Sequence, residues 1–322
     1  MKGTFFMAII IVFCMLVIPL SALKDQPPLS LPASNAQSSV PYETLTDNTP
    51  IEKIKVLKNG EVLEFSLKDY LFGVVAAEMP ALYEEEALKA QTVAAYTFVC
   101  YKKSYNSNLD YDISAEAETA QCFITRQETA ARWGDKADEY ASKLDRCISA
   151  VMGQFITHNN QIILAAYHAL SAGKTNSCQD VWNKDLPYLQ SVDSSSDTLA
   201  ENFLTTVTLT VDEISEKLKS FSAPSSEPQN YFTDILKTDN GYVKSLKYCN
   251  KELSGNDLRN ALNLRSCHFE IAFLENVFTF TVKGYGHGVG MSQTGANALA
   301  KQGKNYEEIL LYYYPNTVLQ KK

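Results

Sequence analysis

Glu78 lies near the end of a predicted helix, on the same face as three apolar residues. Leu71, Val74 and Val75 precede it by seven, four and three residues, which places all four side chains on one helix face. Burial in apolar surroundings raises the pKa of a Glu carboxyl, so this side chain is suited to general acid catalysis near neutral pH. The alternative is a Glu at a helix end that reaches solvent or pairs with a lysine.

A second candidate region runs from Tyr167 to Thr175, where a predicted strand ends in a loop of small and polar residues. Ser171 and Thr175 supply hydroxyls, and Lys174 supplies an ammonium group. A loop of this composition can bind the hydroxyls of a polar ligand. The alternative is a plain turn between two strands.

A third candidate region, residues 284–293, is rich in glycine. The glycines occupy alternating positions: Gly284, Gly286, Gly288 and Gly290. Residues without a side chain allow the backbone to approach another surface closely. The pattern is not the G-x-G-x-x-G of nucleotide-binding proteins, so it does not predict a phosphate site. Its polar members are His287, Ser292 and Gln293, and the histidine is either a structural hydrogen-bonding group or a catalytic base.

The sequence favours a metal site or a hydrolase triad less than it favours the three candidate regions above. It contains no C-x-x-C or H-E-x-x-H motif, and its four histidines are dispersed. A site built from His168, Cys178 and His287 is a minor alternative, and Ser171 lacks the G-x-S-x-G context of a serine hydrolase. We expect no metal and no cofactor. The seven cysteines select no disulfide pairing by their spacing, and we expect them to be mostly unpaired or buried.

The first fifty residues differ in composition from the rest of the chain. Phe5 to Leu20 contains no charged residue and is about long enough to cross a bilayer, so we expect a signal-anchor at residues 1–23, with a cleaved signal peptide as the alternative. Residues 24–50 contain five of the eleven prolines and are expected to form a disordered tether. In both cases the folded part, residues 51–322, is expected to be exported.

The composition of the chain predicts a large hydrophobic core for residues 51–322 and no basic surface. Hydrophobic residues make up 45% of the chain, and the formal net charge is −8, which argues against a nucleic-acid partner. Strands and helices alternate without regular βαβ spacing, so we predict an α+β fold with mixed sheets and two lobes around a cleft. Residues 201–262 are the candidate second lobe.

Local patterns predict individual elements. Asn59 and Gly60 lie between two short apolar runs and predict a hairpin, and Asn159 and Asn160 predict another that extends to Tyr167. Helices are predicted at 67–79, 85–103, 129–152, 212–220 and 254–262. Strands are predicted at 205–211 and 241–249, with two more within 269–282.

Several of these stretches together resemble the SpoIID/LytB family of peptidoglycan lytic transglycosylases. The resemblance rests first on residues 69–80, DYLFGVVAAEMP, and 86–95, EALKAQTVAA. It continues through 167–182, 264–266, 284–296 and the C-terminal stretches 306–310 and 313–315, and so covers nearly all of residues 53–317. The Glu of the A-A-E-M-P motif is the family's catalytic acid, which corresponds to Glu78.

The resemblance implies a reaction that needs a single carboxyl group. Most glycosidases use two carboxyl groups, whereas in a lytic transglycosylase the C6 hydroxyl of the sugar itself attacks. Glu78 is expected to protonate the oxygen of the MurNAc–GlcNAc bond, and then to take the C6 hydroxyl proton as a 1,6-anhydro ring closes. The expected substrate-binding residues are Lys89, Tyr96, Gln121, Ser171, Lys174, Thr175, His287, Ser292 and Gln293.

The chain departs from the family pattern at three places. Tyr96 replaces the usual Arg and lacks its guanidinium, which puts rate or substrate preference in doubt. Ala172 replaces the first Gly of the family's S-x-G-G-K-T loop, which contains Lys174. Some relatives bind zinc with His and Cys beyond the catalytic Glu, but residues 111–123 contain only Cys122 and no His, so this metal is expected to be missing.

The resemblance further implies a role in sporulation. The chain is expected to cleave denuded glycan strands during engulfment, on the outer side of the mother-cell membrane to which its N-terminal helix anchors it. Expected partners are glycan strands, a sporulation amidase and membrane anchor proteins. The alternative is a non-catalytic peptidoglycan-binding module or amidase activator. A wall hydrolase that acts outside sporulation would share the chemistry.

Overall fold

The computed structural model describes residues 51–106, 108–115, 121–224 and 227–321. The predicted signal-anchor and tether lie outside these ranges. Within them, no helix combines the length and the apolar character needed to cross a membrane.

The described part begins with the predicted hairpin. Strands β1 (Lys53–Lys58) and β2 (Glu61–Ser66) pair in antiparallel orientation, and β3 (Ile113–Ser114) adds to β1 in parallel. Asn59 and Gly60 form the turn with φ angles of 53° and 76°. Asn and Gly adopt this left-handed conformation most readily, which is why this dipeptide predicts the hairpin correctly.

Two helices follow the hairpin at the predicted places. Helix α2 (Leu67–Glu78) is capped by the Ser66 side chain, which accepts a hydrogen bond from the backbone N–H of Asp69. It ends because Met79 is extended, as a residue before proline prefers to be. Helix α3 (Glu85–Tyr105) then begins within the acidic run at 84–86.

The single helix predicted at 129–152 is wrong. The structure has two helices, α4 (Arg126–Trp133) and α5 (Ala137–Val151), separated by the 3-10 turn η2 (Gly134–Lys136). Gly134 has a φ of 54°, a left-handed conformation that a regular helix does not contain. Helix α4 also starts earlier than predicted, because Thr125 and Glu128 form a capping box.

The hairpin predicted from 155 to 167 is shorter than expected. Strands β4 (Gln154–His158) and β5 (Gln161–Ile162) pair around Asn159 and Asn160, and β14 (Val318–Lys321) pairs with the other edge of β4. Strand β6 (Tyr167–His168) instead pairs in parallel with β13 (Met291–Ser292). The remaining elements of this region are α6 (Cys178–Trp182), η3 (Ser195–Leu199), α9 (Gln293–Lys301) and α10 (Tyr306–Tyr313).

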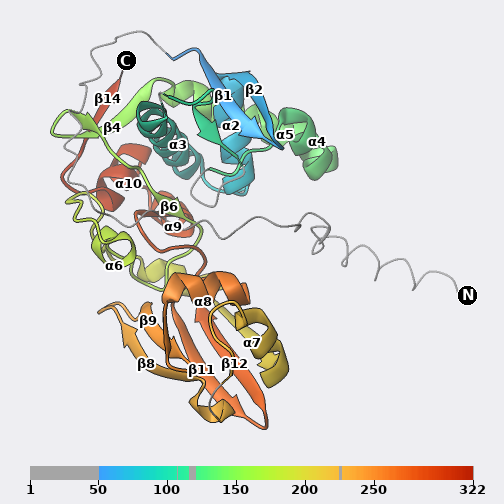
Figure 1. The fold of residues 1–322 in the computed structure, drawn as a ribbon. Helices are drawn as coiled ribbons and strands as arrows, with labels where there is room; N and C mark the ends of the chain where they lie inside the picture. The colour runs from blue at the N-terminus through green and yellow to red at the C-terminus, as the bar shows by residue number, and fades with distance from the viewer. Residues whose placement is uncertain (1–50, 107, 116–120, 225–226, 322) are drawn as a thin grey trace, which may run out of the picture. The chain divides into compact units, whose positions relative to one another are not determined.

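A first hydrophobic core surrounds α3. Helices α2, α5, α9 and α10 and strand β4 all contact this helix (Figure 1). Its residues Ala87, Leu88, Val93 and Ala94 are fully buried. Because α3 is surrounded on all sides, it fixes the ends of α2 and α9 relative to each other.

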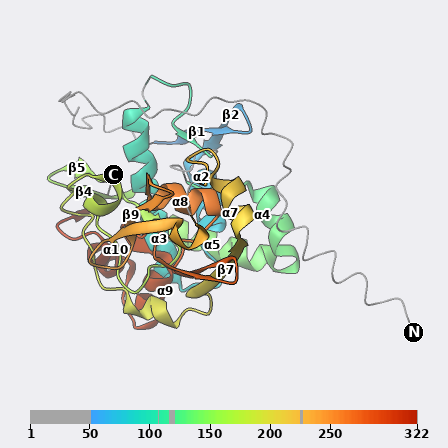
Figure 2. The same cartoon turned by 60° about the horizontal axis from the view of Figure 1, so that its bottom comes forward.

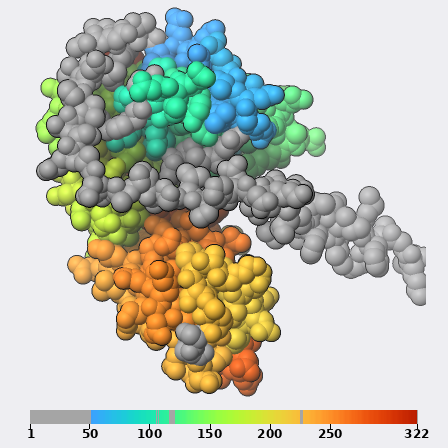
Figure 3. Space-filling model, viewed as in Figure 1, coloured from blue at the N-terminus to red at the C-terminus, as the bar shows by residue number. Residues whose placement is uncertain are grey.

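A second hydrophobic core lies under two three-stranded antiparallel sheets. Their orders are β11-β12-β7 and β10-β9-β8, with α7 and α8 in contact with each other beside them (Figure 2). The bounds are β7 (Leu204–Thr210), α7 (Val211–Leu218), η4 (Pro228–Asn230), β8 (Phe232–Lys237), β9 (Val243–Tyr248), β10 (Lys251–Ser254), α8 (Gly255–Leu262), β11 (Phe269–Leu274) and β12 (Val277–Lys283). Yellow and orange mark the surface of these elements in Figure 3.

The second core extends past the segment 201–262, since Phe269, Phe278, Phe280 and Val282 are among its buried residues. Strand β8 is an edge strand of the sheet β10-β9-β8 and is mostly exposed. Its sequence has little alternation of apolar and polar residues, so the sequence analysis did not predict it. Phenylalanine rings from β8, β11 and β12 pack against one another in this core. The described part is therefore α+β with several small sheets, as predicted, but among them only β2-β1-β3 combines antiparallel and parallel pairing.

The buried Tyr242, which directly precedes β9, contacts the loop at 167–175. The hydroxyl of Tyr242 accepts a hydrogen bond from the backbone N–H of Ala172 (3.0 Å) and donates one to the carbonyl of Lys174 (3.1 Å).

No disulfide joins any of the six cysteines in the described ranges, and five of the six are buried.

Candidate active site

Glu78 is the last residue of α2, and its neighbours on the helix face are buried. Three apolar residues have exposed fractions of 1% or less: Leu71, Val74 and Val75. The carboxyl group lies at the margin of this core. Its Oε1 accepts a hydrogen bond from the backbone N–H of Cys122 (2.9 Å), and its Oε2 accepts one from Nε2 of Gln293 (3.4 Å). The predicted apolar face is thereby confirmed.

Burial dominates the electrostatics of this carboxyl group. It raises the pKa of Glu78, while the hydrogen bonds from Cys122 and Gln293 lower that pKa by a smaller amount. No lysine or arginine of the described residues forms an ion pair with Glu78, and none of the causes of its pKa shift is a cation. The geometry therefore favours a carboxyl that holds its proton over a solvated or salt-bridged one.

Gln293 connects Glu78 to the central helix. It is the first residue of α9, and its Nε2 also faces Oε1 of Gln91 on α3 at 3.4 Å. Both glutamines are buried, and Nε2 of Gln91 has no hydrogen-bond partner among the described residues. The structure therefore places the predicted Gln293 beside Glu78, and it adds Gln91, which the sequence analysis did not select.

Gln121 lies beneath the site among tyrosines. Its Oε1 accepts a hydrogen bond from the Tyr70 hydroxyl, and its Nε2 donates to the Tyr167 hydroxyl (2.9 Å) and the Ala95 carbonyl (3.2 Å). Its side chain is 3% exposed. Because Cys122 is the next residue, this network holds the backbone N–H that meets Glu78.

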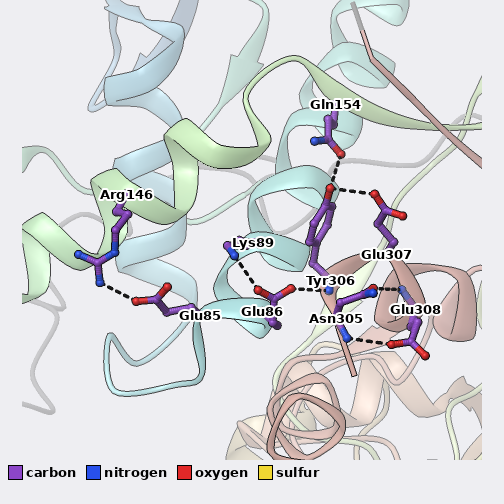
Figure 4. Close-up of polar contacts among 9 residues, drawn as sticks. All are labelled: Glu85, Glu86, Lys89, Arg146, Gln154, Asn305, Tyr306, Glu307 and Glu308. Carbon is purple, nitrogen blue, oxygen red and sulfur yellow. Dashed lines mark hydrogen bonds and ion pairs between the residues drawn. The ribbon is translucent and has the colours of Figure 1, made fainter. Parts of the chain in front are cut away.

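Lys89 lies with a different set of residues. Its Nζ is paired with Glu86 (2.6 Å), and the second oxygen of Glu86 accepts a hydrogen bond from the backbone N–H of Tyr306 (2.8 Å) (Figure 4). These contacts join the start of α3 to the start of α10. No hydrogen bond or ion pair among the described residues connects Lys89 with Glu78.

Tyr96 is also separated from solvent. Its side chain is 3% exposed and belongs to the first core, and burial raises the pKa of its hydroxyl. In this conformation its ring has no open face on which a sugar can stack.

The loop at 167–175 presents one of its three candidate side chains to solvent. Ser171 and Thr175 are fully buried, whereas Lys174 is exposed. The Thr175 hydroxyl accepts a hydrogen bond from the backbone N–H of Val192 (2.9 Å). The two hydroxyls serve the packing of this loop, and the Lys174 ammonium is the group available to a ligand.

Asp197, on η3, joins the two candidate loops. Its Oδ2 accepts hydrogen bonds from the backbone N–H of Ser171 (2.9 Å) and from the hydroxyls of Ser194 (3.0 Å) and Ser292 (2.7 Å). Its side chain is fully buried, and this burial raises its pKa. The sequence analysis missed Asp197, since nothing in the polar run DSSSD at 193–197 distinguishes it from a solvated turn.

The glycine-rich segment packs closely on the β6 region. A Cβ on Gly290 would lie 2.0 Å from the carbonyl oxygen of Ala166, and the φ of Gly290 is 72°, so glycine is required there. The ring of His287 lies 5.7 Å from that of His168 and 5.1 Å from that of Trp182. His287 accepts a hydrogen bond at Nδ1 from the backbone N–H of Val289 (3.0 Å).

Burial keeps both histidines neutral near pH 7. It lowers the pKa of His287 to about 3 and that of His168 to about 4. His287 also lines a polar cavity of about 110 Å3, together with residues that include Asn176, Asp180, Lys244 and Asn256. These rings do not titrate in the range in which a neutral-pH acid or base acts.

Metal-ligating side chains do not gather in the described ranges. No group of three or more His, Cys, Asp or Glu residues there has the geometry to hold a metal ion. Cys178 is buried in the first core.

Comparison with known proteins assigns the family. The model of the SpoIID family, described as stage II sporulation protein, matches residues 58–158. The chain is 33% identical to stage II sporulation protein D of Bacillus subtilis (strain 168) over 96% of its own length and 91% of that protein. It is 31% identical to the protein of the same name from Bacillus amyloliquefaciens, over 95% and 90% of the two chains.

A more distant relative carries a different name. The amidase enhancer of Bacillus subtilis (strain 168) is 26% identical over 77% of this chain, which corresponds to 40% of that relative. The first two relatives cover nearly the full chain at more than 30% identity. The resemblance seen in the sequence motifs is thereby confirmed, and the chain belongs to the stage II sporulation protein D (SpoIID) family.

Proposed function

We propose that this SpoIID-family protein is a peptidoglycan lytic transglycosylase in which Glu78 is the catalytic acid. The observation that carries the proposal is the carboxyl group of Glu78, which is part-buried, has a raised pKa and is paired with no cation of the described residues. A general acid that works near neutral pH needs this combination. A carboxylate with a purely structural role in the same position would be stabilised by a cationic partner, and Glu78 has none among the described residues.

The proposed reaction uses one carboxyl group twice. Protonated Glu78 donates its proton to the oxygen of the MurNAc–GlcNAc bond, and the bond between that oxygen and the MurNAc C1 breaks. The carboxylate then accepts the proton of the C6 hydroxyl as its oxygen bonds to C1. The product is a 1,6-anhydro sugar, and Glu78 has regained its proton. No water molecule is consumed in this reaction.

The groups around Glu78 fit this cycle. The backbone N–H of Cys122 and the amide of Gln293 both donate to the carboxyl group, so they stabilise the negative charge that appears after proton donation. Exposed Lys174 is the candidate for contact with the polar groups of the glycan. A site with these groups needs no metal to move the proton.

The cellular setting is part of the proposal. The two relatives that match nearly the whole chain are both named for sporulation. A glycan substrate agrees with a role in degrading the cell wall during that process. We further propose that residues 1–23 anchor the chain in the membrane, with the described domain on the extracytoplasmic side, where glycan strands, an amidase and membrane anchor proteins are accessible.

A second candidate function is supported by the relative named amidase enhancer. In that role the chain would bind glycan or an amidase without cleaving the strand. Buried Tyr96, in place of the arginine usual in the family, is the feature that favours this alternative.

One digestion separates the two functions. The full chain in detergent is incubated with glycan strands freed of stem peptides, and the products are examined by mass spectrometry. Wild type should release peptide-free 1,6-anhydro sugars, Glu78→Gln should release none, and Glu61→Gln, at an exposed position of β2, should match wild type. No anhydro product from wild type, together with stimulation of an added amidase, would support the activator instead.

A further inference from the structure

The amide of Gln293 lies beside Glu78 because α9 begins where it does, and the start of α9 rests on Asp197. The Ser292 hydroxyl caps α9 by accepting a hydrogen bond from the backbone N–H of Gly295 (3.2 Å). The same hydroxyl donates to Oδ2 of Asp197 at 2.7 Å. One hydroxyl therefore joins the buried carboxyl group to the first turn of the helix that carries Gln293.

The first turn of α9 also packs directly against the surroundings of Asp197. A Cβ on Gly295 would lie 2.0 Å from the Tyr313 hydroxyl, 2.4 Å from Oγ of Ser194 and 3.1 Å from Oδ1 of Asp197. Gly295 has a helical backbone, so its lack of a side chain serves this close approach. The position of the turn is thus determined by contact as well as by the Ser292 hydrogen bond.

The carboxyl group of Asp197 is costly to keep in this place. It is fully buried, three groups donate to Oδ2, and Oδ1 has no partner among the described residues. A buried oxygen without a partner destabilises the fold. A feature that costs stability and joins both candidate loops to α9 points to a role in the site itself.

We infer that Asp197 is a positioning residue for Glu78. Its carboxyl group holds Ser292 and the first turn of α9, and so keeps the Gln293 amide within reach of the Glu78 carboxyl. Asp197 does not touch the reacting sugar in this role. It acts through Ser292 and Gln293, and its loss should change the protonation of Glu78.

The direction of that change follows from the hydrogen bond. The Gln293 amide donates to Glu78 and lowers its pKa, so a displaced amide leaves the pKa higher. The loss of one such bond corresponds to a shift of about half a unit. The other titratable groups that face Glu78 are Tyr70, Tyr167 and Cys122, and their pKa values are raised further into the alkaline range, so they do not obscure it.

The first experiment reads this shift without requiring activity. The 13C signal of the Glu78 carboxyl is titrated by NMR in the full chain in detergent, for wild type and for four variants. Asp197→Ala and Gln293→Leu should each raise the pKa by about half a unit, and the double variant should show no larger shift than Gln293→Leu. Asp197→Asn, which keeps one acceptor oxygen for the serines, should give a smaller shift than Asp197→Ala.

Asp193→Ala is the matched control, since Asp193 is exposed and lies in the same polar run. It should leave the Glu78 titration unchanged. A folded Asp197→Ala protein with the wild-type Glu78 pKa would overturn the inference, as would shifts from Asp197 and Gln293 that add. Should Asp197→Ala fail to fold by circular dichroism, Ser292→Ala takes its place with the same expected direction and the same contrary outcome.

A second readout rests on the proposed lytic activity. Because the reaction starts from protonated Glu78, the rate falls as pH rises through its pKa, and Asp197→Ala should move this alkaline limb upward with kcat lowered more than KM. A wild type without activity would contradict the proposed function alone, because the NMR titration still decides the role of Asp197.

Discussion

Nε2 of Gln293 lies 3.4 Å from Oε2 of Glu78, although 215 residues separate them in the chain. This pair joins the end of α2 to the start of α9, the two elements that carry the A-A-E-M-P motif and the glycine-rich segment. The site is therefore a property of the tertiary fold.

The first prediction concerns the stability of the Glu78→Gln variant. The pKa of Glu78 is raised in the folded state, so the native carboxyl contributes fully below its unfolded pKa, and that contribution is lost as pH rises through the folded value. Glutamine carries no charge at any pH. The variant should therefore gain stability relative to wild type at pH 8 and lose that advantage at pH 4, as measured by thermal unfolding. A pH-independent difference would contradict the raised pKa.

The second prediction concerns Cys122, the exposed cysteine beside Glu78. Although the residue as a whole is exposed, partial burial of its thiol and the neighbouring carboxyl raise the pKa of that thiol to about 11. At pH 8 the thiolate fraction is then lower than that of an unshifted thiol by on the order of a hundredfold, so iodoacetamide should react slowly, with a rate that rises up to about pH 11. Peptide mapping by mass spectrometry identifies the modified residue.

The same cysteine links modification to activity. An alkyl group on Cys122 should block access to Glu78, whereas Cys122→Ala keeps the backbone N–H that donates to Glu78 and should keep most of the proposed lytic activity. The alanine variant is also the control, since iodoacetamide should not inactivate it. Rapid inactivation of that variant would assign the effect to another cysteine.

The third prediction concerns the close packing at Gly295. Alanine at this position places a Cβ 2.0 Å from the Tyr313 hydroxyl and 2.4 Å from Oγ of Ser194. Overpacking of this kind should destabilise the domain by about 1–3 kcal/mol in chemical denaturation. Adding Ser194→Ala and Tyr313→Phe removes both oxygens and should restore part of the loss. A Gly295→Ala protein as stable as wild type would show that the turn can shift freely.

The fourth prediction concerns acid stability and His287. Its folded pKa of about 3 lies below the ordinary value of 6.5, so the unfolded chain binds a proton that the native chain does not between these values. Stability should therefore fall as pH drops from 6.5 toward 3. Replacement by Gln should make that fall shallower in thermal melts. His158, which is half-buried on β4, provides the control substitution, and an equal effect there would contradict the assignment.

Sequence patterns predicted local features well. The turn at Asn59 and Gly60, the end of α2 before Pro80, and the buried face below Glu78 each depend on residues that are near one another in the chain. The helix predicted at 129–152 failed because the left-handed conformation of Gly134 overrides an otherwise helical composition. The hairpin to Tyr167 failed because that residue pairs with Met291 instead.

The candidate site was predictable in part for the same reason. Glu78 carries both a helical pattern and a family motif. Asp197 carries neither, because two of its partners, Ser171 and Ser292, are 26 and 95 residues away and only the folded chain brings them together. Burial of Tyr96 and the contact of Lys89 with Glu86 likewise depend on how α3 is surrounded.

The parallel pairing of β6 with β13 has a consequence for how the protein is made. Residues 291–292 must be present before residues 167–168 acquire their partner strand, and the helix that meets Glu78 begins directly afterwards. A nascent chain that stops short of this point contains the acidic residue without its opposing amide. Such late assembly from distant segments is slow to fold, and an unfinished chain lacks the pairing of Glu78 with Gln293 on which the proposed site depends.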